Sequence, residues 1–279
     1  MNKIAIIGAG AVGGALAGKL VALGYDVTIA NSRGPNSLRD VEARTGAKAV
    51  DLADTLANAE LAIVAIPTGR IPALGDAVKR SLPPGAILVD AGNYYPERDG
   101  HIAELDHGTP ESAWVSAQLG RPVVKAFNNI VAGGLLSAAR PSGAADRVAL
   151  PVAGDDDQAR SAVMRLIDAL GFDTLDAGSL ATSWRQQPGQ PAYCTNPTLN
   201  DLSRLLDRAD RTKGSINRDK GMKLMAGLPP GFPSHRLVQV ARLSAGLDAW
   251  KPASWFAALT LAWAILRSKA GTKSPRSSA

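Results

Sequence analysis

Short apolar runs alternate with amphipathic stretches over the first two thirds of the chain. "KIAII" (3–7), "ELAIVAIP" (60–67) and "AILVDAG" (86–92) are continuous apolar runs bounded by breakers, as expected for strands buried on both faces of a sheet. Similar patterns predict strands at 25–30, 122–128, 147–154 and 172–178, and helices at 12–23, from 35 to before 46, 69–80, 111–119 and 155–170. The alternation predicts an α/β fold with a parallel, doubly wound sheet over roughly residues 1–178.

The last third of the chain lacks this alternation. A Pro/Gly-punctuated stretch (183–197) leads to helical patterns at 199–211, 235–247 and 252–268, with a loop at 225–233. We therefore predict a sheet domain over 1–180, a smaller helical C-terminal part over 181–268, and a disordered tail over 269–279.

Composition fits an ordinary folded protein, with 46% hydrophobic and 20% charged residues. The net charge of +6 is uneven: 14 Lys and Arg stand against 4 Asp from Arg204 onward, which leaves 17 basic and 21 acidic residues in the first 203. We interpret this charge as a solvated helix face or as a site for an anionic substrate. Nucleic-acid binding is disfavoured because no recognised module accompanies the charge. One cysteine, Cys194, excludes an intrachain disulfide and is compatible with the cytoplasm, where we expect the protein.

A glycine-rich turn follows the first predicted strand. "GAGAVG" (8–13) fits G-x-G-x-x-G at the opening of a helix, where Gly8 allows the tight turn, Gly10 lets the backbone approach a pyrophosphate and Gly13 permits close helix–strand packing. The helix start, with Ala11 and Val12, offers unpaired N–H groups to phosphate oxygens. This turn predicts a dinucleotide site; the alternative is a glycine-rich turn without a ligand.

The second predicted strand ends in "NSRGPN" (31–36) instead of the acidic residue that commonly binds the ribose 2′-OH of NAD. A carboxylate would repel a 2′-phosphate, whereas Arg33 can pair with it and Ser32 can donate a hydroxyl. Asn31 and Asn36 add neutral donors. We predict NADP(H) over NAD(H), with an exposed, water-facing turn as the alternative.

These motifs resemble a known family. The pattern "KIAIIGAGAVG…VTIANSRGP…AIVAIP…VVKAFNNI…PVAGDDDQARSAVMRLIDALGFDTLDAGSL" is similar, over about residues 2–185, to the coenzyme F-420-dependent NADP reductases and to the reductase portion of the STEAP ferrireductases. The resemblance implies a Rossmann-type domain that binds NADP(H) with a deazaflavin or flavin stacked against the nicotinamide. This chain departs from the family by about a hundred further residues of basic, helical sequence, and by Asn128 where some members have His.

Residues after the later strands are candidates for the reacting end of the cofactor. Ile66 and Pro67 would wall the nicotinamide, and Asn93 would lie beside it together with Tyr94. Asn128 would serve with Asn93 as a positioning amide. The alternatives are turn residues for Pro67, a packing aromatic for Tyr94 and a helix cap for Asn128. We expect no metal, because His101, His107 and His235 lack ligand spacing.

The function that we predict is hydride exchange between NADPH and coenzyme F-420 or a flavin-like acceptor, which needs no covalent nucleophile. One alternative is an NADPH-dependent reductase of a small carbonyl or imine, with Lys125, Tyr94 or Asp90 as proton donor. A second alternative is a non-enzymatic NADP(H) sensor whose basic part contacts a partner.

The helical pattern at 252–268 has no charge from Ala253 to Leu266, and Trp250, Trp255 and Trp263 lie in or beside it. The run is shorter than the roughly 20 residues that span a bilayer. We favour burial in the core or in a homodimer interface over contact with a membrane surface.

The reading of "NSR" generates a test of cofactor choice. Arg33→Asp should weaken NADPH binding by at least about tenfold, because it replaces a partner of the 2′-phosphate with a charge that repels it, and should leave NADH binding unchanged. Titration of both cofactors by fluorescence measures the two affinities. Equal losses for NADPH and NADH would contradict the assignment.

Overall fold

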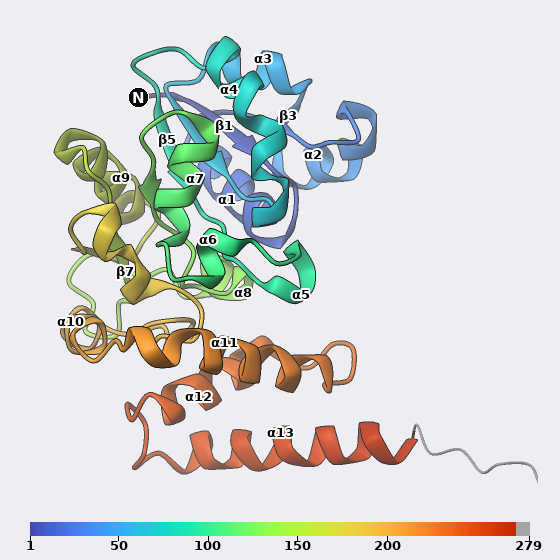
Figure 1. Cartoon of the computed structure of the whole chain (residues 1–279), viewed down its shortest axis with the longest axis vertical. Coiled ribbons are helices and arrows are strands. Elements are labelled where there is room, and N and C mark those ends of the chain that lie inside the picture. Colours follow the sequence, from blue (N-terminus) through green and yellow to red (C-terminus); the bar gives the residue numbers. More distant parts are fainter. Residues whose placement is uncertain (272–279) are drawn as a thin grey trace, which may run out of the picture.

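The chain was analysed as a computed structural model, which describes residues 1–271, with side chains through Arg267. Helices and strands follow one another in the first 180 residues, and helices alone follow thereafter (Figure 1). Of the tail that the sequence predicted to be disordered (269–279), residues 269–271 belong to the last helix. Residues 272–279 lie outside the described residues.

Six strands form one parallel sheet in the order β3-β2-β1-β4-β5-β6. This is the strand order of the Rossmann fold, in which the direction of winding reverses beside β1. The predicted doubly wound sheet is therefore confirmed. Its strands are β1 (Lys3–Ile7), β2 (Asp26–Ala30), β3 (Lys48–Ala49), β4 (Leu61–Val64), β5 (Ile87–Asp90) and β6 (Val124–Lys125).

Helices cover both faces of this sheet, because its central strands are apolar on both sides. On one face, Ile6 and Ile63 pack in a core with α1 (Ala11–Ala22), α2 (Arg39–Thr45), α8 (Ala132–Ser137) and α9 (Asp157–Ala169). On the other, Ala5 and Ala62 pack with α3 (Leu52–Ala57), η2 (Thr68–Leu74), α4 (Gly75–Ser81), α6 (Ala103–Asp106) and α7 (Glu111–Leu119). The remaining short helices here are η1 (Pro35–Leu38) and α5 (Pro96–Asp99).

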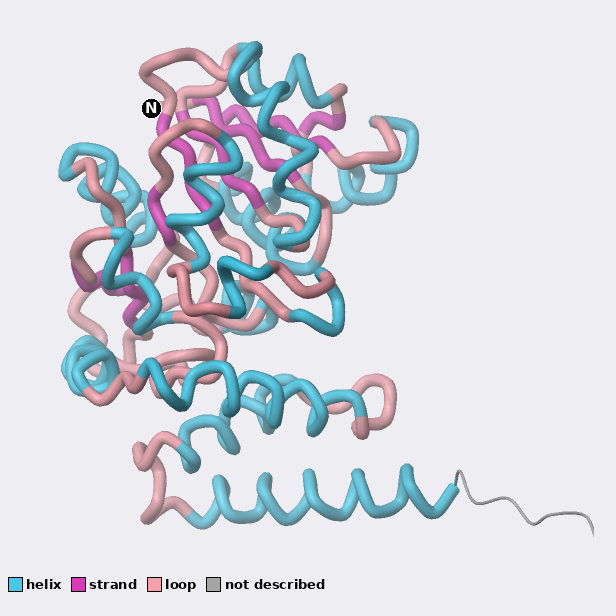
Figure 2. Tube along the Cα trace, viewed as in Figure 1, coloured by secondary structure: helices cyan, strands magenta, loops and turns pink. Residues whose placement is uncertain are grey.

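The prediction of a single sheet through residue 178 was wrong. The strands β7 (Ala149–Val152) and β8 (Asp173–Asp176) form a separate parallel pair, joined to the large sheet by one antiparallel bridge between Lys125 and Ala153. Phe127 has a left-handed backbone (φ 62°), which turns the chain away after β6 and ends its ladder after two residues. Figure 2 shows this pair apart from the main sheet.

The C-terminal part contains η3 (Leu180–Gln186), α10 (Leu199–Asp207), α11 (Arg211–Ala226), α12 (Ser234–Ser244) and α13 (Pro252–Gly271). Leu202, Leu205 and Leu206 of α10 pack on the β7–β8 pair. The helices α11, α12 and α13 lie below the sheet unit in Figure 1, with α13 outermost. Within the described residues no helix is long and apolar enough to cross a membrane. The division of the chain at residue 180 stays a prediction.

Candidate functional site

The carboxyl ends of four neighbouring strands bring the predicted site segments to one edge. In the parallel register, Ile7 of β1 lies beside Ala30 of β2 and Val64 of β4, and Val64 lies beside Asp90 of β5. The glycine turn, the NSR loop, the Ile66–Pro67 segment and the Asn93 segment therefore leave the sheet at the same level. This edge is where open parallel sheets bind ligands.

Three glycines of the first turn have different reasons to be glycine. At Gly8 the backbone is left-handed (φ 111°), and a Cβ would lie 2.4 Å from the carbonyl oxygen of Ala65. At Gly13 a Cβ would lie 1.9 Å from the carbonyl oxygen of Gly8, so the helix could not pack against the strand. Gly10 is exposed, has φ −72°, and a Cβ there would meet nothing within 4 Å. Neither backbone conformation nor packing within the chain requires glycine at this position.

The open space at Gly10 fits a dinucleotide pyrophosphate. Gly10 is the residue before α1, and the amide of Gly14 is bonded to its carbonyl oxygen at 2.8 Å. The amides of Ala11, Val12 and Gly13 precede this first helical bond, so they are free to donate to phosphate oxygens at the positive end of the helix. Methyl groups at residue 10 would stand in the path of a close phosphate.

The loop after β2 is ordered by its own side chains. The Oδ1 atom of Asn31 accepts from the backbone amide of Arg33 at 2.9 Å, and its Nδ2 atom donates to the Ser37 hydroxyl at 2.9 Å. Ser32 and Arg33 are exposed beside this turn. Arg39 donates to Oδ1 of Asn36 at 3.2 Å. Asn31 therefore shapes the loop, and Arg39 adds a second guanidinium that the sequence reading missed.

The segment after β4 lies between the glycine turn and the loop after β5. A Cβ at Gly8 would lie 2.8 Å from the side chain of Ile66, and one at Gly92 would lie 3.6 Å from the Ile66 carbonyl oxygen. Ile66 is half-buried and Pro67 is exposed. Both are therefore at the edge where the sequence predicted them.

The two predicted positioning amides meet each other. Asn128 donates to Oδ1 of Asn93 at 3.1 Å, and Asn93 donates to the carbonyl oxygen of Asn128 at 2.9 Å. Asn128 is 3% exposed and is also bonded in both directions to Gln186 of η3, at 2.8 and 3.0 Å. Its amide is thus committed inside the protein, while half-buried Asn93 is the member of the pair that borders the edge. Val131 occupies the N-cap position of the following helix α8, so Asn128 is not its helix cap.

A pair of tyrosines adjoins Asn93. The hydroxyls of Tyr95 and Tyr193 are 2.5 Å apart, and Tyr193 lies 3.5 Å from Nδ2 of Asn93. Burial raises the pKa of Tyr95 to about 12 and that of Tyr193 well above its usual value, so both phenols stay protonated at neutral pH. The Arg98 guanidinium lies 5.1 Å from the centre of the Tyr95 ring and donates to the carbonyl oxygen of Asn93 at 2.6 Å.

The residues proposed from the sequence as proton donors for a carbonyl lie elsewhere. Tyr94 is 1% exposed, its ring is in the core, and its hydroxyl bonds Asp106 at 2.8 Å. Lys125 and Asp90 are 0% and 1% exposed and are 3.5 Å apart. The structure does not bring these three to the open edge. Tyr95, which no sequence pattern distinguished from Tyr94, is the tyrosine whose hydroxyl adjoins the Asn93 region through Tyr193.

A buried charge cluster supports the loop after β5. Nζ of Lys125 lies 3.5 Å from carboxylate oxygens of both Asp90 and Glu111 and donates to the carbonyl oxygen of Gly92 at 3.1 Å. Two carboxyls share one ammonium here. Burial raises the pKa of Glu111, and the attraction of the Lys125 ammonium, which lowers that pKa, only partly offsets the effect. The cluster fixes where Asn93 and Tyr95 leave the sheet.

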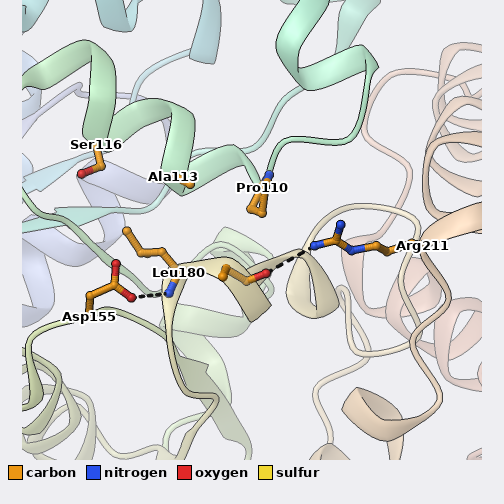
Figure 3. A pocket seen from close by; sticks show the side chains of 7 residues that line it. Pro110, Ala113, Ser116, Asp155, Leu180 and Arg211 are labelled. Atoms are coloured by element: carbon orange, nitrogen blue, oxygen red, sulfur yellow. Dashed lines mark hydrogen bonds between the residues drawn. The ribbon is translucent and has the colours of Figure 1, made fainter.

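Two hollows that Arg211, the first residue of α11, borders lie away from the glycine turn. Figure 3 shows one of about 370 Å³, where Asp155 accepts from the Leu180 amide at 2.9 Å and Arg211 reaches the carbonyl oxygen of Ala181 at 3.4 Å. Arg211 also borders a second hollow of about 340 Å³ that Glu111 and Arg218 line. Of the residues that the sequence indicated for the reacting end of the cofactor, Tyr94 lines the second hollow, and Ile66, Pro67, Asn93 and Asn128 line neither.

Comparison with known proteins agrees with this geometry. The family model for coenzyme F-420-dependent NADP oxidoreductases matches residues 3–94. A crystal structure of hypothetical protein SMa0349 from Sinorhizobium meliloti is 38% identical, with a TM-score of 0.62 over 71% of this chain and 96% of its own. A candidate F-420-dependent NADP-reductase from Arthrobacter sp. FB24 is 30% identical, with a TM-score of 0.56 over 66% of this chain and 87% of its own. The chain belongs to the F-420-dependent NADP oxidoreductase family.

The match to one curated protein is shorter. The chain is 39% identical over 74 residues to YjhV of Escherichia coli K12, which is 26% of this chain and 54% of that one, so it spans about half the length of this curated relative. The family's members are NADP-dependent oxidoreductases, and the expected resemblance is confirmed. Both solved relatives leave about a third of this chain without a counterpart.

The glycine geometry generates a paired test. Gly13→Ala should lower the free energy of unfolding by about 1–3 kcal/mol or more, because its Cβ would overlap the Gly8 carbonyl. Gly10→Ala should nearly keep that stability but weaken NADPH binding by at least about tenfold, because its methyl group occupies the phosphate approach. Urea unfolding and NADPH titration measure the two effects.

Gly85→Ala is the matched control, since a Cβ there also meets nothing within 4 Å and the residue lies away from the edge. It should change neither quantity. Unaltered NADPH binding by Gly10→Ala would show that no phosphate approaches this turn.

Proposed function

We propose that the protein transfers hydride from NADPH to a deazaflavin such as coenzyme F-420, or to a related flavin. The observation that carries the proposal is the shared edge: the open cradle at Gly10 and the neutral polar group at Asn93 follow strands that end at the same level. An extended dinucleotide bound along this edge would have its 2′-phosphate at the NSR loop, its pyrophosphate at the glycine turn and its nicotinamide toward Asn93.

Residues beside the two phosphate positions support NADP(H). Ala11, Val12 and Gly13 would donate backbone amides to the pyrophosphate beside Gly10, and Arg33 with Ser32 would hold the 2′-phosphate. The bond from Asn31 to the Arg33 amide preorganises that loop, so less conformational entropy is lost on binding. When bound, NADPH supplies the hydride.

Residues at the other end suit an uncharged planar ring. Ile66 and Pro67 offer an apolar wall, while Asn93, Tyr95 and Tyr193 offer neutral hydrogen-bonding groups. Transfer to a deazaflavin requires that the donor and acceptor carbons be held together without water. The ring itself disperses the negative charge that arrives with the hydride. The family relationship to an F-420-dependent NADP-reductase supports this acceptor class.

The basic residues of α11 give the acceptor's anionic part a place to bind. Arg211 and Arg218 line the hollow of about 340 Å³, and their guanidinia are stacked on Trp184 (5.0 Å) and Tyr94 (5.2 Å). Such stacking holds the two guanidinium groups in fixed orientations, so little further side-chain entropy is lost when they bind an anion. Carboxylate or phosphate groups on a flavin-like acceptor are the complementary chemistry.

One observation favours a second candidate, reduction of a small carbonyl or imine. Reduction of a carbonyl transfers hydride to carbon and a proton to oxygen, and the hydrogen-bonded phenols of Tyr95 and Tyr193 are a proton source beside Asn93. The phenolate so formed would regain its proton from water. A deazaflavin does not require this proton from the protein.

The two candidates predict different results for Tyr95→Phe. NADPH oxidation should be followed with coenzyme F-420, FMN, FAD, a quinone, a ferric chelate and a panel of carbonyls and imines. With F-420 we expect turnover in the wild type and a kcat within about threefold of it in Tyr95→Phe, whereas carbonyl reduction would fall about 10²–10⁴-fold.

Tyr25→Phe is the control, because this half-buried tyrosine lies beside α1 and away from Asn93. Turnover of carbonyls alone, lost in Tyr95→Phe and kept in Tyr25→Phe, would replace the deazaflavin proposal with the second candidate. Tight NADPH binding without turnover of any acceptor would contradict both and favour a sensor.

A further inference from the structure

The outer face of α13 presents a continuous apolar seam. Phe256, Leu259, Trp263 and Leu266 are spaced three, four and three residues apart and are 63%, 69%, 56% and 65% exposed. Residues at this spacing form one stripe along a helix, as they do in helices that pair with another helix. We call these four residues the α13 seam.

The helix is already held to the protein by its opposite face. Ser254, Ala257 and Leu261 are buried, at 1%, 1% and 5% exposure, and α13 packs closely with α12. The seam is therefore not the contact that fixes α13 in place. Among residues 1–267, whose side chains the structure describes, Arg236 lies over the Phe256 ring at 5.7 Å and Arg267 over the Trp263 ring, but all four seam side chains remain more than half exposed.

Charged groups near the seam are directed onto their own chain. No charged side chain occurs between Pro252 and Leu266. At one end, Lys251 pairs with Asp248 at 3.0 Å; at the other, the Arg267 guanidinium stacks over Trp263 at 3.9 Å. Arg236 and Arg267 therefore lie on aromatic rings of the seam, where a delocalised guanidinium is more easily desolvated than an ammonium.

The exposed apolar area is large enough for a stable dimer. Trp250 and Trp255 flank the seam at 77% and 54% exposure. An aromatic side chain buries roughly 150–250 Å² in full, so the seam and its flanks can contribute on the order of 600–800 Å² per copy. A standard specific interface buries about 800 Å² per partner.

We propose that a second copy of this chain docks on the α13 seam, giving a twofold-symmetric homodimer in which the seams of two α13 helices pack together. A stripe with alternating three- and four-residue spacing is complementary to itself, which is what a twofold contact requires. A membrane-surface helix instead carries a charged polar face along its length, and the inner face of α13 is packed on protein.

The test is the mass of the full-length protein in solution. Analytical ultracentrifugation of the wild type at micromolar concentration should give twice the chain mass. Leu259→Glu puts a charge at the middle of the contact twice, once from each copy, and should weaken dimerisation by at least about a hundredfold. The far-ultraviolet circular dichroism spectrum should be unchanged, because Leu259 is exposed in the single chain.

Leu136→Glu is the matched control, since this leucine of α8 is 63% exposed but lies on a different face. It should leave the dimer intact. A monomeric wild type overturns the proposal, and its co-sedimentation with anionic phospholipid vesicles would identify a membrane contact instead. A dimer that persists in Leu259→Glu also overturns it, because the contact would then lie elsewhere.

Discussion

The buried ammonium of Lys125 is the interaction on which the functional edge depends. It joins β6 to Asp90 of β5 and Glu111 of α7. Because Lys125 is 0% exposed, its ammonium cannot donate to bulk water instead. Removing Lys125 would leave two buried carboxyls without a cation in a low-dielectric interior, which is strongly destabilising. Because the same ammonium also bonds the Gly92 carbonyl, the charge pairing in the core determines where the following residue, Asn93, emerges.

Two strained backbone positions lie where the sheet unit meets the C-terminal half. Phe127 and Cys194 are non-glycine residues with left-handed backbones (φ 62° and 55°), a conformation that costs on the order of 1–3 kcal/mol each. The first turns Asn128 inward onto Gln186, and the second follows Tyr193, whose hydroxyl meets Tyr95. The Cys194 amide also donates to the Asn129 carbonyl at 2.9 Å. The strained turns lie where two distant segments are brought together beside Asn93.

Local motifs were predictable from the sequence, and contacts between distant segments were not. The glycine turn and the parallel sheet depend on short-range spacing; the turn was found where the pattern predicted it, and the sheet was found as far as β6 but not through residue 178. The helix α11 was missed because "RTKGSINRDKGMKLMA" has two internal glycines and no apolar period. The Tyr95–Tyr193 pair joins residues 98 positions apart, and no local pattern indicates such a pairing. The left-handed backbone of Phe127, just after β6, could not be predicted either, because bulky residues rarely adopt that conformation.

Direct transfer of hydride is the central claim, and an isotope label tests it most directly. NADPH carrying deuterium at carbon 4 of the nicotinamide, in either stereochemical position, would be mixed with the protein and oxidised coenzyme F-420 in ordinary water. The account predicts that, from one of the two stereoisomers, the deuterium arrives at carbon 5 of the reduced deazaflavin, where a carbon-bound label does not exchange with solvent; mass spectrometry detects it. Reduced deazaflavin without deuterium from either stereoisomer, or no NADPH oxidation, would contradict the account.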